Sequence, residues 1–321
     1  MTGHEKKGLD EAAVALSMAY DCGDAGVVDR RKAKMLLHKA LENSCEFAAK
    51  YQIHKMIYGL AGIGKNPQKA MQICIDLVDR QTAELGRENV NPLWYFYSGS
   101  AKRAISGCTE GGDEFQMAAD AGLIMAWADL AIARSHDRNE KMTDKNAFLS
   151  WIRRGADLRD NFCMYFLAMS KVEDYDDMPK YKQLMAARQV VIDLEAAYEA
   201  GSGEAAEALG DIFYYGQYGI DENNEMAFSY YAKGALYNSA TCYEKMFDMI
   251  NGHFVDKPLA FRDLIALHGA RAGSRKLMNE TVIAHTYGRM EEYSKEIEQL
   301  YAPVFDDEDY PDDDGRFDAD A

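Results

Sequence analysis

The chain has 321 residues, of which 48% are hydrophobic and 28% charged, and only 6 prolines, so it can bury a large apolar core. Its net charge is −17, and a surface of that sign repels the phosphates of nucleic acids and of anionic lipids. These totals argue against nucleic acid as a partner and against membrane insertion. They favour a basic or amphipathic protein or peptide.

The N-terminal segment lacks the pattern of a signal peptide, because Asp10 and Glu11 interrupt its apolar run. No stretch of the chain approaches 18 uncharged apolar residues, the length at which a membrane-spanning helix is expected. We therefore expect a cytoplasmic protein in which residues 1–8 form a flexible N-terminus. The 6 cysteines include no CxxC pair, which favours buried thiols in a reducing compartment over disulfides or a zinc site.

From residue 9 onward a helical pattern repeats. Turn-like dipeptides recur 35 to 42 residues apart, and their second residues are Ser44, Gly86, Gly122, Arg159, Gly201, Asn238 and Gly273. Between them the apolar residues have the period of amphipathic helices, and Asn-Pro pairs at Asn66 and Asn91 mark helix starts. We predict an all-α fold of about seven helix-turn-helix units. These units cover 9–44, 45–86, 87–122, 123–159, 160–201, 202–238 and 239–273, followed by a partial unit or cap helix over 274–305.

The sixth unit carries the clearest motif, LGDIFYYGQYGIDENNEMAFSYYAKGA, at residues 209–235. Its glycine and aromatic spacing resembles the Sel-one-like repeat, a relative of the tetratricopeptide repeat. The resemblance covers roughly residues 9–300 and is weakest in the fifth unit, where residues 161–200 contain no glycine. It implies a right-handed α-solenoid that serves as a scaffold or adaptor for other proteins.

One glycine-rich stretch, GLAGIGKN at residues 59–66, approaches the phosphate-binding loop. That loop requires a preceding strand and a hydroxyl after the lysine, whereas here residues 48–58 have helical spacing and Asn66 follows the lysine. We interpret Gly59 and Gly62 as turn residues. A ligand-binding or enzymatic site between repeats near residues 59–66 remains the weaker alternative.

The remaining chemistry-bearing residues form no recognisable site. The 7 histidines have no paired metal-ligand spacing, and no nucleophile motif occurs. The sequence therefore predicts a non-enzymatic protein with no catalytic residues, no metal and no cofactor.

By analogy with tetratricopeptide arrays, the first helix of each unit is expected to line the concave face. Tyrosine and tryptophan are typical interface anchors, because they bury a large area at low entropic cost. Trp94–Tyr97 is a run of four consecutive rings around one helix, too many for the core of its own unit. The alternative for any single ring is packing between repeats. The candidate partner-binding residues are Met18, Asp21, Tyr58, Trp94, Tyr97, Asp211, Tyr214 and Tyr215.

Together these patterns predict a scaffold or adaptor that binds a protein or peptide on its concave helical surface. A regulatory or immunity-type protein that neutralises one specific partner is the alternative. Residues 306–321 carry nine carboxylates and one arginine, and we expect them to form a disordered acidic tail. This tail either keeps the protein soluble, docks a basic partner or plugs the groove.

Overall fold

The computed structural model describes residues 3–22, 29–59 and 64–294, and the side chains of all of these except residues 3–6 and 22. Within them it contains 15 α-helices, a few 3-10 turns and no strand beyond an isolated bridge between His136 and Met142. The prediction of an all-α solenoid is confirmed. The predicted acidic tail over residues 306–321 lies outside the described part of the chain.

The helices form seven pairs, and the two helices of each pair pack on one another. The first helices of the pairs are α1 (Gly3–Cys22), α3 (Glu46–Tyr58), α5 (Pro92–Ser106), α7 (Ala126–Ser135), α9 (Asn161–Met169), α11 (Gly203–Tyr215) and α13 (Ala240–Asn251). The second helices are α2 (Arg30–Glu42), α4 (Pro67–Leu85), α6 (Gly112–Asp120), α8 (Lys145–Asp157), α10 (Lys180–Glu199), α12 (Asn224–Ala235) and α14 (Leu259–Arg271). Helix α15 (Arg275–Thr286) follows the last pair.

The N-terminal boundary differs from the expected one. Helix α1 begins at Gly3, inside the segment 1–8 that was expected to be flexible. The residues from His4 to Lys7 include glutamate and lysines, which favour helix, and no proline interrupts the turn that leads into the apolar stripe.

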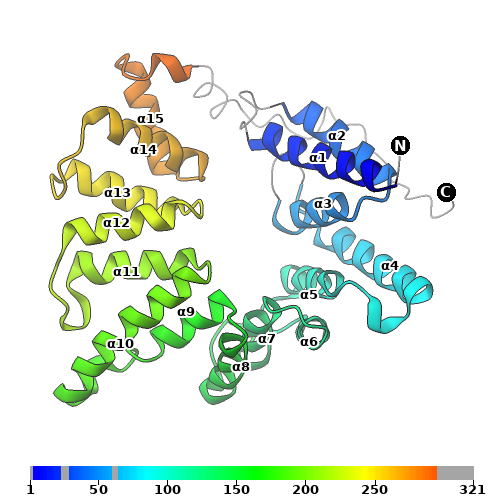
Figure 1. Cartoon of the computed structure of the whole chain (residues 1–321), viewed down its shortest axis with the longest axis horizontal. Helices are drawn as coiled ribbons and strands as arrows, with labels where there is room; N and C mark the ends of the chain where they lie inside the picture. Colours follow the sequence, from blue (N-terminus) through cyan, green and yellow to red (C-terminus); the bar gives the residue numbers. More distant parts are fainter. Residues whose placement is uncertain (1–2, 23–28, 60–63, 295–321) are drawn as a thin grey trace.

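Successive pairs stack side by side into an arch, with α1 and α2 at one end and α14 and α15 at the other (Figure 1). Along the arm that begins at α3, the first helices α3, α5 and α7 lie on the inner side and α4, α6 and α8 on the outer side. First helices also contact one another along the chain, α1 with α3, α3 with α5, α7 with α9 and α9 with α11. We call the surface formed by the seven first helices the first-helix face.

Local capping chemistry explains where the helices begin. The Asn66 side chain accepts a hydrogen bond from the Lys69 amide, and Asn91 accepts one from the Leu93 amide, so both Asn-Pro pairs start helices as predicted. Helices α11, α13 and α15 begin in the same way, each after a serine whose hydroxyl accepts from the amide three residues later. These helices therefore start with their own side-chain caps, whereas α3 and α7 start without one.

The chain reverses between pairs through a left-handed backbone position. The seven residues at which the sequence analysis ends its units all have positive φ, from +56° to +106°. They are Ser44, Gly86, Gly122, Arg159, Gly201, Asn238 and Gly273. Four of them are glycine, the residue that adopts this region without steric cost.

Arg159 adopts this conformation with a Cβ atom, at φ +63°. We expect Arg159→Gly to raise the free energy of unfolding by up to about 1 kcal/mol, because glycine relieves the strain of the left-handed conformation. The greater entropy of glycine in the unfolded chain offsets part of this gain. Urea denaturation followed by circular dichroism measures this change. The matched control is Gly201→Ala, at φ +106°, which we expect to destabilise by about 1–2 kcal/mol. A destabilised Arg159→Gly variant would contradict the interpretation of strain.

Small residues let the helices approach closely both within and between units. A Cβ on Gly210 of α11 would lie 2.4 Å from the Tyr231 ring of α12, and a Cβ on Gly155 of α8 would lie 2.4 Å from Cys163 Sγ of α9. The second kind of contact recurs, because a small residue in a second helix is followed eight residues later by a buried residue in the next first helix. The pairs are Ala40–Ala48, Ala118–Ala126, Gly155–Cys163, Ala197–Ala205, Gly234–Cys242 and Gly269–Leu277.

Candidate functional site

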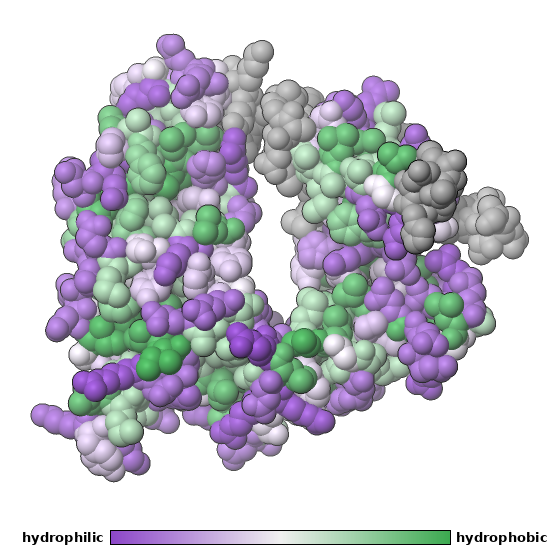
Figure 2. Space-filling model, in the orientation of Figure 1, coloured by the Kyte–Doolittle hydropathy of each residue, from purple (hydrophilic) through white to green (hydrophobic). Residues whose placement is uncertain are grey.

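The first helices α3, α5 and α7 lie on the side of the arch that faces its opening (Figure 1). Figure 2 shows that side chains leave an opening between the arm formed by the early pairs and the arm formed by the late pairs. Polar side chains and scattered apolar ones border this opening. The site is therefore described residue by residue along this face.

Two of the predicted residues occupy equivalent places in their units. Tyr58 is the last residue of α3 and Tyr215 the last residue of α11, and each precedes a left-handed glycine that caps its helix, Gly59 or Gly216. Each tyrosine is 51% exposed. Because a helix C-terminus projects its last side chain past the packed turn, both rings are accessible although the helices that carry them are largely buried.

Tyr215 is held by a polar network that joins α11 to α13. Lys245 Nζ donates to the Tyr215 hydroxyl at 2.7 Å and lies 3.3 Å from Asp211 Oδ1. The buried Tyr231 hydroxyl donates to the same Asp211 oxygen at 2.6 Å. Burial opposes the charge of Lys245, but the hydrogen bond with Tyr215 and the charge of Asp211 raise its pKa above the usual value. The network keeps the Tyr215 ring in one place.

Tyr214 lies deeper than Tyr215 on the same helix end. Its ring packs edge-on against the rings of Tyr215, at 4.8 Å between centroids, and of Phe254, at 5.7 Å. It is partly buried, so it supports Tyr215 from behind and presents only part of its own ring.

Tyr58 lies near charged residues of the next two first helices. Burial, followed by the charge of Asp129 of α7, raises its pKa, while the charge of Arg103 of α5 works in the opposite direction. His54 lies one turn earlier, with its ring 4.6 Å from that of Tyr58, and burial lowers its pKa. Tyr58 and Tyr215 thus share an arrangement, a half-exposed ring at the C-terminal end of a first helix, just before a left-handed glycine.

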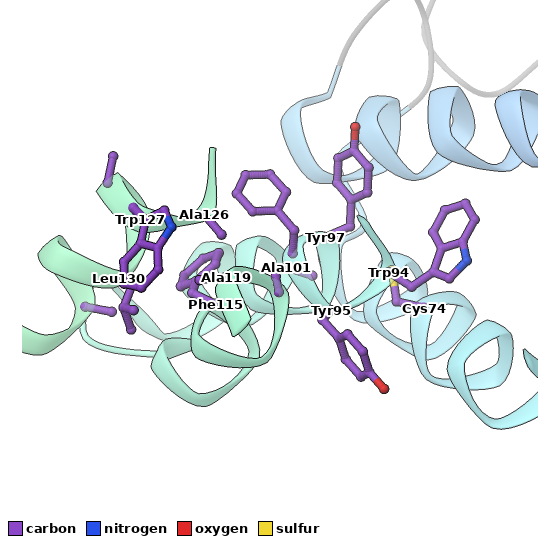
Figure 3. Close-up of a cluster of buried hydrophobic side chains, with 14 of the residues drawn as sticks. Cys74, Trp94, Tyr95, Tyr97, Ala101, Phe115, Ala119, Ala126, Trp127 and Leu130 are labelled. Carbon is purple, nitrogen blue, oxygen red and sulfur yellow. The ribbon is translucent and has the colours of Figure 1, made fainter. Parts of the chain in front are cut away.

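Two of the predicted anchors are instead core residues. The Trp94 side chain is 1% exposed and that of Tyr97 6% exposed, and all four rings of the run from Trp94 to Tyr97 are buried (Figure 3). Helix α5 packs against α3, α4 and α6, so the rings find apolar neighbours on every side. The placement of Trp94 and Tyr97 at a partner surface is therefore corrected, because neighbouring units cover the arc that their own unit leaves open.

Asp21 also differs from its expected role. Its carboxylate is buried, accepts hydrogen bonds from Lys55 Nζ at 2.5 Å and from the Tyr51 hydroxyl at 2.8 Å, and so ties α1 to α3. It cannot contact a partner without breaking these bonds. Met18, one turn earlier on α1, is exposed.

Two further ion pairs, which no local sequence pattern predicts, join helices of successive units. Arg103 of α5 pairs with Asp129 of α7, and Lys276 of α15 binds both carboxylate oxygens of Asp248 of α13 at 2.6 Å. Their sequence separations of 26 and 28 residues are not those of a local helix pair. A signal exists only in the alignment of successive units, where a charged residue in one unit faces a residue of opposite charge in the next.

The structure also bears on the phosphate-loop-like stretch, the cysteine thiols, metal binding and membrane spanning. Helix α3, not a strand, precedes the glycine-rich stretch 59–66, whose residues 60–63 lie outside the described chain. Burial raises the pKa of the Cys74 and Cys242 thiols to about 12 and raises that of Cys163 further. In the part of the chain that the structure describes, no group of three histidine, cysteine or carboxylate side chains could hold a metal ion, and none of the helices has the length and apolar character needed to cross a membrane.

No family model and no curated protein sequence matches this chain. Among solved structures, it is similar to a Sel1 repeat protein from Oxalobacter formigenes, with 18% identity and a TM-score of 0.48 over 73% of this chain and 88% of the other. It is also similar to a protective antigen with an SLR fold from uropathogenic Escherichia coli, with 14% identity and a TM-score of 0.45 over 93% and 71%. A third similar structure is the Pseudomonas aeruginosa protein PA5086, with 16% identity and a TM-score of 0.49 over 70% and 80%.

Proposed function

We propose that this protein is a scaffold or adaptor that binds a protein or peptide on its first-helix face. The observation that carries the proposal is the recurrence of one arrangement at Tyr58 and Tyr215. Each is a half-exposed tyrosine at the end of a first helix, just before a left-handed glycine, and Lys245 of the next unit also holds the hydroxyl of Tyr215. A ring that is already fixed in place loses little conformational entropy when a partner covers it, so such rings are effective interface anchors.

Fewer residues contact the partner in this proposal than the sequence predicted. It keeps Met18, Tyr58 and Tyr215 as exposed side chains, with Asp211 and Tyr214 as their supports. The net charge of −17 favours a partner with basic groups, whose approach would be steered by charge and would slow as salt is added. Cytoplasmic location is part of the same proposal.

The test compares partner recovery by immobilised wild-type protein and by the variant Tyr58→Ala/Tyr215→Ala. If both rings are anchors, the variant should bind at least about tenfold more weakly, the loss expected for the truncation of an interface hot spot. The matched control is Tyr287→Ala, an exposed ring after the end of α15 and outside the first-helix face. Equal affinity of wild type and the double variant, with both folded by circular dichroism, would refute the role of these rings.

A further inference from the structure

The outer face of α10 carries an apolar stripe that the other described helices leave uncovered. Four of its side chains, Tyr181, Leu184, Met185 and Ile192, are 57–69% exposed. They share one side of the helix with Arg188, Glu195 and Glu199, because all seven lie within about 60° of one direction at 100° per residue. We call these seven residues the α10 outer face.

The helix cannot rotate to hide this stripe. Its opposite side is buried in the solenoid through Ala187, Val190, Leu194 and Ala197. Helix α10 is also 20 residues long whereas its pair helix α9 has only 9, so it reaches beyond its neighbours at the lower left of Figure 1. An apolar stripe fixed outward on a projecting helix is typical of an interaction surface.

The charges of α10 indicate what covers the stripe. On the α10 outer face the base Arg188 precedes the acids Glu195 and Glu199, and Lys180 and Lys182 flank the first turn, whereas the acid Asp193 lies to the side and pairs with Lys171. A helix with this gradient is complementary to a second copy of itself that runs in the opposite direction. A parallel copy would instead bring like charges together.

We propose that two copies of this chain associate through antiparallel pairing of their α10 outer faces. In the register that brings Arg188 of one copy to Glu195 of the other, the two Ile192 side chains meet at the two-fold axis. Leu184 and Met185 of each copy then lie opposite the stem of Glu199 of the other. The four apolar side chains cover roughly a few hundred Å² per copy, at the low end of specific interfaces, so the dimer is weak and depends on concentration.

Sedimentation velocity of the full chain over a series of concentrations tests the pairing. Wild type should shift from monomer toward dimer as concentration rises. Leu184→Glu/Met185→Glu should remain monomeric, because it places carboxylates in the apolar stripe. Arg188→Glu should weaken the dimer at least tenfold, and adding Glu195→Arg should restore it. Because Glu195 accepts a hydrogen bond from the Tyr230 hydroxyl at 2.6 Å, the melting temperature of each variant is measured alongside.

The matched control is Leu236→Glu, which changes an 81% exposed leucine after the end of α12 and should leave the dimer intact. A wild type that stays monomeric at every concentration overturns the proposal. A folded charge-swap variant that fails to regain the dimer overturns the antiparallel register. Since α10 is a second helix, these variants leave the first-helix face unchanged, and failure here is independent of the partner-binding proposal.

Discussion

Lys55→Met is expected to lower the free energy of unfolding by about 3–5 kcal/mol, because it leaves the Asp21 carboxylate buried without its ionic partner. The Lys55 side chain is 4% exposed and the Asp21 side chain 2% exposed, so water cannot replace the lost interaction. The Tyr51 hydroxyl remains as a donor to Asp21, at 2.8 Å, and satisfies only part of the charge. Urea denaturation of wild type and variant measures the loss.

The control is the double variant Asp21→Leu/Lys55→Met, which removes both charges. We expect it to lose less stability than Lys55→Met alone, since no buried charge is left unpaired and an apolar pair of similar size fills the space between α1 and α3. If the double variant instead loses the sum of the two single losses, the pair does not act as a coupled unit.

Trp94→Ala is expected to cost about 3–5 kcal/mol through the cavity that it leaves between α4 and α5. Trp94 is among the largest fully buried side chains and belongs to the core cluster that continues from Ile53 to Cys163. Because each unit is stabilised by its neighbours, the loss should appear as early unfolding of the units around α5. Thermal denaturation and hydrogen exchange of these helices measure it.

Trp94→Phe is the matched control for this substitution. The indole nitrogen of Trp94 has no hydrogen-bond partner among the described residues, so replacing the indole by a phenylalanine ring breaks no hydrogen bond. It removes only part of the buried side-chain volume. We expect its cost to be less than half that of Trp94→Ala. At a temperature where Trp94→Ala is still folded, partner recovery should equal that of wild type. If the folded Trp94→Ala variant lost partner binding, Trp94 would instead belong to the partner surface.

The helix starts and unit ends could be predicted from the sequence because their causes are local. A capping asparagine before Pro67 or Pro92 satisfies amides within the next three residues, whatever the rest of the chain does. The seven unit ends were recognised from their spacing, and each requires a left-handed position within its own turn. The helical period of the sixth unit places Phe213, Tyr230 and Tyr231 on its apolar stripes, and all three are buried.

The binding residues could be predicted only in part, because exposure depends on the neighbouring units. Four consecutive rings around α5 are too many for the core of its own pair, and the packing of α5 against α3 and α4 of the preceding pair helps to bury Trp94 and Tyr97. The sequence pattern around Asp21 predicts a surface residue. The structure buries it because Lys55 of α3, 34 residues later, donates a hydrogen bond to its carboxylate.

By itself, the sequence determined that this protein is a row of helix pairs, since periodicity and turn chemistry act within a few residues. The tertiary structure alone decided which tyrosines remain accessible, which charges are buried in pairs and that α10 projects its apolar stripe outward. The physical reason is that each of these outcomes depends on which surfaces the neighbouring units cover. The spacing of residues within one unit does not specify these contacts between units.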